Sequence, residues 1–258
     1  MGNGFAKSDA CTAVAKRLGH GRVFVIRQDV ASASATLERL VSPLVRDLRF
    51  VSPLYGTPIR CCDLKGEAER ARQGGVALAA DLSGLTSLGC FAFVRGCDAM
   101  VEDLSPLGPR FGGLCAIGVS KAFLARHRID ADALVAGLPL AAEVDLAGLE
   151  DAVLAFDEKR RRSSDVAQVV ATYLLCHPRV RRVWYPGIKC DDSFAAASNV
   201  LQGGFGPVVD FEAEGELASA ALPTCVQLVS GAATGTIVRV TCIDTEALAF
   251  VADLERLF

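Results

Sequence analysis

Short apolar runs with strand character alternate with amphipathic helical stretches through the first two thirds of the chain, and this alternation restricts the fold more than any other feature. We expect strands at 22–27, 48–52, 76–81, 99–103 and 114–119. Between them, apolar residues recur at helical spacing in 33–46 and 64–72, and Gly74-Gly75 after the second stretch is typical of a helix end. Such strand–helix–strand repeats predict an α/β domain with a mostly parallel sheet.

A long helical pattern at 146–176 separates this part from a second arrangement of elements. Strands are expected at 180–185, 207–212, 226–230 and 236–242, followed by a closing helix at 245–257. This order is typical of a smaller α+β domain. We place the boundary between Leu138 and Glu158, and assign residues 1–145 to the large α/β domain and 146–258 to the small C-terminal domain.

Composition excludes several classes of protein. The 27 Lys and Arg residues are scattered, apart from the run 159–162, which is too short for a nucleic-acid surface and is typical of a solvated helix end. No apolar run reaches the roughly 20 residues that span a bilayer, and the N-terminus lacks a signal-peptide core, so we expect a cytoplasmic protein with no membrane partner. The ten cysteines form no Cys-x-x-Cys pair, which favours buried, reduced thiols over a metal site.

Two ordered motifs in the C-terminal part carry a family resemblance. Residues 173–187 read YLLCHPRVRRVWYPG, and residues 202–212 read QGGFGPVVDFE. With its helix ending in His-Pro, its strand ending in Tyr-Pro-Gly and its Gly-Gly strand entry, the chain resembles the trans-sulfuration enzymes of Cys/Met metabolism, of the cystathionine γ-synthase, cystathionine lyase and methionine γ-lyase type. The resemblance covers nearly the whole chain and implies fold type I, with pyridoxal phosphate as cofactor. Family members carry a longer segment before this point, so we expect a large domain that is shortened at its N-terminus.

The resemblance also implies roles for residues of the large domain. Asp81 ends its strand where the family has the carboxylate that keeps the pyridine nitrogen protonated; its alternative role is to cap the following turn. Counted from Asp81 at the family's spacing, the Schiff-base lysine falls on Pro106, which has no amine. Lys121, in a Ser-Lys pair further along, is the substitute candidate; its alternative is an exposed lysine at a helix start.

The phosphate and substrate contacts of the family are altered as well. Asp103 stands where the family has a phosphate-binding serine, and a carboxylate there would repel a phosphate dianion. Ser105 keeps the hydroxyl that the family has at its position. Arg239 matches the arginine that holds the substrate α-carboxylate, with a surface or structural salt bridge as its alternative role.

Three functions stay open at this point. The first is a family member that is inactive by itself and that associates with copies of itself or with a full-length homologue, or binds a small amino acid or anion weakly. The second is an active pyridoxal-phosphate-dependent C–S lyase or γ-synthase that uses a relocated Lys121. The third is a remnant with no selected role.

Overall fold

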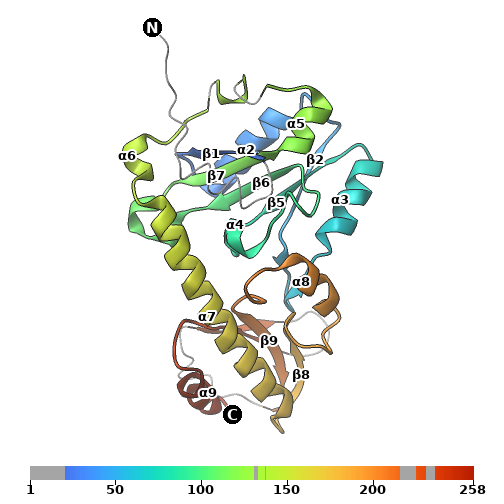
Figure 1. Cartoon of the computed structure of the whole chain (residues 1–258). Coiled ribbons are helices and arrows are strands. Elements are labelled where there is room, and N and C mark those ends of the chain that lie inside the picture. Colours follow the sequence, from blue (N-terminus) through green and yellow to red (C-terminus); the bar gives the residue numbers. More distant parts are fainter. Residues whose placement is uncertain (1–20, 131–132, 137, 216–224, 231–235) are drawn as a thin grey trace. The chain divides into compact units, whose positions relative to one another are not determined.

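The computed structural model describes residues 21–130, 133–136, 138–215, 225–230 and 236–258 (Figure 1). The chain divides into two compact units, residues 1–53 with 63–157 and residues 54–62 with 158–258. The division falls inside the long helix α7 (Leu149–Cys176). The N-terminal segment on which the signal-peptide prediction rests lies outside the described residues.

The first unit contains a five-stranded sheet in the order β1-β7-β6-β5-β2. Its strands are β1 (Gly21–Ile26), β2 (Leu48–Val51), β5 (Ala77–Asp81), β6 (Ala99–Asp103) and β7 (Cys115–Ser120). β2, β5 and β6 pair in parallel, whereas β7 is antiparallel to both β6 and β1. Four of the five strands therefore point the same way, and the prediction of a mostly parallel α/β sheet is confirmed.

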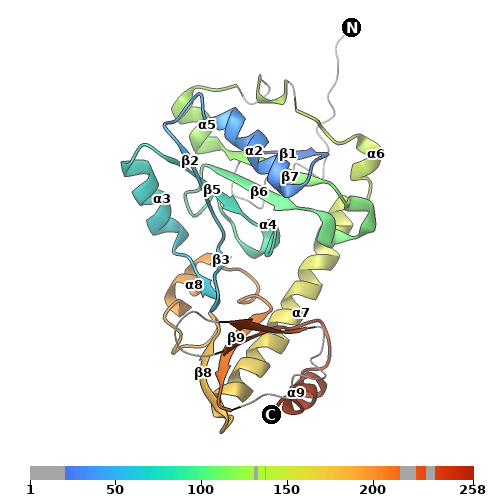
Figure 2. The same cartoon turned by 180° about the vertical axis from the view of Figure 1, so that it is seen from behind.

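Helices cover both faces of this sheet. On one face α2 (Val30–Val41) and α5 (Lys121–His127) share a core with the strands, which Figure 2 shows from that side. This core includes Leu37, Val41, Ala79, Val119 and Phe123. Of the other elements in this unit, α3 (Leu64–Gln73) packs on β5, and the short helices are α4 (Thr86–Gly89), η1 (Ser105–Leu107), η2 (Pro109–Phe111), η3 (Ala133–Val135) and α6 (Glu143–Leu146).

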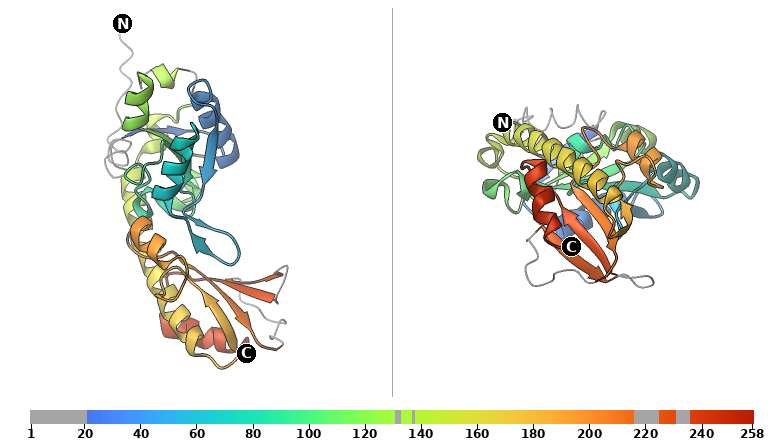
Figure 3. Two further views of the ribbon diagram at one scale, coloured as in Figure 1. Left: turned by 90° about the vertical axis from the view of Figure 1, so that its right-hand side faces the viewer. Right: turned by 90° about the horizontal axis from the view of Figure 1, so that it is seen from below.

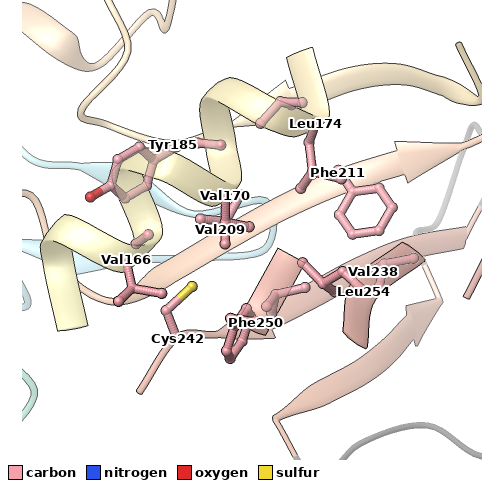
Figure 4. Packing of buried hydrophobic residues seen from close by; sticks show 14 of the residues in the cluster. Val166, Val170, Leu174, Tyr185, Val209, Phe211, Val238, Cys242, Phe250 and Leu254 are labelled. Atoms are coloured by element: carbon pink, nitrogen blue, oxygen red, sulfur yellow. The ribbon is translucent and has the colours of Figure 1, made fainter. Parts of the chain in front are cut away.

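The second unit is built on an antiparallel sheet in the order β10-β11-β9-β8. Its strands are β8 (Val180–Trp184), β9 (Val208–Ala213), β10 (Val226–Ser230) and β11 (Thr236–Thr241), and its helices besides α7 are α8 (Phe194–Val200) and α9 (Ala247–Glu255). Figure 3 shows α7 and α9 on one face of the sheet. Figure 4 shows the core that these helices form with the sheet, in which Val170, Leu174, Phe211, Val238 and Leu254 are buried together. The predicted α+β arrangement is present in these residues.

The two family-like motifs contact one another in this unit. Tyr185 is fully buried, and its single hydroxyl proton is shared between the carbonyl oxygens of Ser164 (3.2 Å) and Gly206 (3.1 Å). The Ser164 hydroxyl in turn accepts from the backbone N–H of Phe205 at 2.8 Å. Hydrogen bonds therefore join the Tyr-Pro-Gly and Gly-Gly segments to α7. These contacts give both motifs a structural role inside the second unit.

Gly204 illustrates this constraint and gives a first prediction. Its φ is +117°, and a β-carbon at this position would overlap the Ser164 side chain. We expect Gly204→Ala to lower the free energy of unfolding by about 1–3 kcal/mol, because alanine would be strained in that backbone conformation and would displace Ser164. Denaturant unfolding measures the loss. Gly75→Ala is a suitable comparison, because its φ is also positive (+69°) but no atom lies within 4 Å of an added β-carbon.

A short hairpin, β3 (Leu54–Tyr55) and β4 (Arg60–Cys61), was not predicted. It lies in sequence between β2 and α3 of the first unit but belongs to the second unit. Each of its strands has two residues, which is too short for a side-chain period to be recognised.

Candidate functional site

Asp81 and Asp103 lie at the same edge of the first unit's sheet. β5 and β6 are parallel neighbours, so their carboxyl ends meet there. The carboxylate of Asp81 accepts from the N–H of Ser83 at 3.0 Å, which is the turn-capping role that the sequence left open. The Ser83 hydroxyl accepts from the N–H of Asp103 at 3.1 Å. Ser83, which was not predicted as a site residue, thus connects the two strand ends.

Asp103 engages the one hydroxyl that was expected to serve a phosphate. Its carboxylate accepts from the N–H of Ser105 at 2.9 Å and from the hydroxyl of Ser105 at 2.5 Å. Pro106 follows in η1 and is exposed. The donors of Ser105 are therefore directed at a carboxylate instead of at an anion from solution.

Lys121 is not brought together with these residues. β7 runs antiparallel to β6, and Asp103 lies opposite Cys115. Lys121 begins α5, six residues beyond Cys115, which corresponds to about 20 Å along the strand direction, at the other edge of the sheet. The Ser120 hydroxyl caps this helix by accepting from the N–H of Phe123 at 3.1 Å, and Lys121 is exposed.

Pyridoxal phosphate does not fit the residues at the Asp81 edge. The chain has no lysine between Lys65 and Lys121, so the segment that follows Asp81 offers no amine for a Schiff base. Asp103 stands where the resemblance expects a phosphate-binding serine, and its carboxylate would repel a phosphate dianion. The role at the pyridine nitrogen that the resemblance assigns to Asp81 stays a prediction.

Arg239 lies in the second unit, on β11, directly opposite Asp210 of β9. Its Nε donates to Oδ1 of Asp210 at 2.8 Å and its Nη2 donates to Oδ2 at 2.7 Å. Asp210 is fully buried and raises the pKa of Arg239 above its usual range. The hairpin completes the cluster, because Nη2 also donates to the Gly56 carbonyl oxygen (2.6 Å) and the N–H of Ile59 donates to Oδ2 of Asp210 (2.5 Å).

Asp210 was not among the predicted site residues. A sequence signal for it exists, since a single acid interrupts the apolar run Val208-Val209-Asp210-Phe211. A charged residue in a strand of this kind is buried only when it is paired, and its partner lies 29 positions further along the chain. The alternation of β11 alone does not identify that partner.

Glu102 is a second buried acid that the sequence did not single out. It follows Met100 and Val101 on β6, and the residue is 1% exposed. Its Oε2 accepts from the N–H of Ser87 at 3.0 Å, and burial raises the pKa of Glu102 to about 7. A cavity with room for about one water molecule is lined by Val23, Val25, Ser87, Glu102, Leu104, Ala116, Leu149 and Val153.

The cysteines follow the sequence prediction in part. Five of the nine described cysteines are buried, and burial raises the pKa of the Cys115 and Cys242 thiols to about 12, so both stay protonated. Cys176 and Cys190 are exposed.

Within the described ranges no three His, Cys, Asp or Glu residues are placed to hold a metal ion. In the same ranges, no helix combines the length and the apolar character needed to cross a membrane.

Comparison with known proteins gives matches among solved structures. No protein-family profile and no curated protein matches the chain. It is similar to an apo methionine γ-lyase from Micromonospora echinospora, with 14% identity and a TM-score of 0.70 over 97% of this chain and 86% of that one. A structure described as cystathionine γ-lyase from the same organism has 14% identity and a TM-score of 0.72 over 97% and 85%.

A cystathionine γ-synthase from Xanthomonas oryzae pv. oryzae, in complex with aminoacrylate and cysteine, has 16% identity and a TM-score of 0.68, with 95% of this chain and 83% of that one covered. The three matches span most of each chain, and at these identities they define the fold. The chain therefore has the mixed α/β fold of the cystathionine and methionine γ-lyases and γ-synthases, which is fold type I of the pyridoxal-phosphate enzymes.

Proposed function

We propose that the chain is a non-catalytic relative of the trans-sulfuration enzymes of sulfur amino acid metabolism, and that it acts by associating with another subunit. Its fold and its two C-terminal motifs support the kinship. The single observation that carries the inactivity is the composition of the Asp81 edge, where Pro106 replaces the amine and Asp103 engages Ser105. Schiff-base chemistry requires a lysine, and neither a proline nor a carboxylate can replace it.

The first experiment is the spectrum of the purified chain with added pyridoxal phosphate. We expect no absorbance band between about 400 and 430 nm that borohydride can trap on the polypeptide, because the Asp81 edge offers no amine. Mass spectrometry after borohydride treatment identifies any modified lysine. A single trapped lysine whose substitution removes the band would contradict the proposal.

The alternative activity, a C–S lyase or γ-synthase that uses Lys121, has its own variant. Lys121→Ala would abolish such a band, whereas Lys189→Ala, in the second unit, would leave it unchanged. Lys121 begins α5 at the far edge of the sheet from Asp81, so we expect both variants to behave like the wild type in this assay.

Association is tested in the native host, in the cytoplasm where we place the protein. A stable complex with a full-length homologue, or a defined oligomer of this chain alone, supports the subunit role. Recovery only as a monomer or as an aggregate supports the third possibility, a remnant without a selected role. Light scattering after size-exclusion chromatography distinguishes these outcomes by mass.

A further inference from the structure

We propose that Asp210 is an internal ligand of Arg239, so that the position matching the family's substrate-carboxylate clamp is filled by the chain's own carboxylate. The inference rests on the proposed function in one respect: the match of Arg239 to the arginine that holds the substrate carboxylate in the family. It concerns the second unit, so it depends on none of the residues at the Asp81 edge.

The contact has the form that arginine uses to bind a free carboxylate. Nε and Nη2 of Arg239 each donate to a different oxygen of Asp210, at 2.8 and 2.7 Å, which is a bidentate pair. The same Nη2 also donates to the Gly56 carbonyl oxygen at 2.6 Å. The guanidinium edge that would receive a substrate carboxylate is thus already engaged by three oxygen contacts.

Displacement of Asp210 by a ligand would be costly. The Asp210 side chain is 0% exposed, whereas that of Arg239 is 22% exposed. A ligand that bound Arg239 in place of Asp210 would leave the buried Asp210 carboxylate without a cation. An unpaired buried charge of this kind costs several kcal/mol in other proteins, so the displacement is strongly disfavoured. Asp210 is also held in place covalently, so it competes at a high effective concentration against any free amino acid.

The hairpin fixes the internal ligand from its other side. The N–H of Ile59 donates to Oδ2 of Asp210 at 2.5 Å, and residues 54–62 belong to the same unit as Arg239. The hairpin therefore forms hydrogen bonds with both partners: the Ile59 N–H donates to Asp210, and the Gly56 carbonyl oxygen accepts from Arg239. This arrangement closes the Arg239 site to a small carboxylate as long as the carboxylate of Asp210 occupies it.

The test uses the full chain with ¹⁵N-labelled arginine. The Nε–Hε resonance of Arg239 is assigned by its loss in Arg239→Lys and is followed during titration with acetate, then with glycine, at constant ionic strength. In the wild type we expect no saturable shift through the millimolar range. In Asp210→Asn, which keeps an oxygen for the N–H of Ile59, we expect a saturable shift with a millimolar Kd. Asp192→Asn, at a side chain that is 90% exposed, is the matched control and should behave like the wild type.

Two results would overturn the inference. One is a saturable shift of the Arg239 resonance in the wild type, and the other is a folded Asp210→Asn variant that does not respond to either carboxylate. If Asp210→Asn does not fold, the wild-type titration still decides, together with hydrogen exchange of the Ile59 amide, which should be slow and unaffected by acetate. The spectrum with pyridoxal phosphate tests for a lysine that forms a Schiff base, so its outcome is independent of the Arg239 titration.

Discussion

Arg239→Ala is expected to lower the free energy of unfolding by about 3–5 kcal/mol, because it leaves a buried carboxylate without its charged partner. Asp210 is fully buried, and Arg239 contributes two of its hydrogen bonds. A substrate-binding arginine in an open site would give a much smaller loss. Equilibrium unfolding in denaturant, followed by circular dichroism, measures the difference.

Two further variants sharpen this result. Arg256→Ala removes an exposed arginine whose partner Asp253 is also exposed, and we expect a much smaller change there. The double variant Arg239→Ala/Asp210→Ala should lose less than the sum of the two single variants, since it removes the unpaired charge together with its partner. Additive losses, or an Arg239→Ala variant as stable as the wild type, would show that the two groups do not depend on one another.

Glu102 is expected to make the first unit less stable as the pH rises from acid to neutral. Because its pKa is raised from 4.5 to about 7 in the folded state, the folded chain retains a proton that the unfolded chain has released. This stabilisation is complete below the unfolded pKa of 4.5 and is lost as the pH rises through about 7. A shift of this size corresponds to a loss of about 3 kcal/mol.

The measurement is the difference in unfolding free energy between Glu102→Gln and the wild type across this pH range. Glutamine keeps an acceptor for the N–H of Ser87 and carries no charge, so the variant should gain stability relative to the wild type as the pH rises. Glu69→Gln, at an exposed position of α3, should show no such trend. Parallel pH profiles for Glu102→Gln and the wild type would mean that Glu102 does not retain its proton.

Local pattern was sufficient for most of the elements. β6 was predicted with the bounds Ala99–Asp103 that it has, because a short run with strand character lies there. The long helix was predicted at 146–176 and observed at Leu149–Cys176. The antiparallel direction of β7 was not predicted, since side chains alternate in the same way whichever way a strand runs.

Fewer features of the candidate site could be predicted from local sequence patterns. Position 106 was identified as a proline by counting along the chain, and no fold is needed to see that it carries no amine. The hydrogen bonds from Ser105 to Asp103 and the distance of Lys121 from Asp81 depend on turn geometry and strand order. Residues that are close in the sequence, such as Asp103 and Lys121, were separated by the antiparallel step between β6 and β7.

The sequence by itself determined the alternation of elements, the resemblance carried by two motifs and the proline at position 106, because each of these depends on residue type and spacing. Only the tertiary structure decided that Arg239 is paired with Asp210, that the hairpin 54–61 contacts both, and that Glu102 is buried. The physical reason is that strand register and burial bring together groups that are far apart in the chain, and no local pattern records which groups will meet.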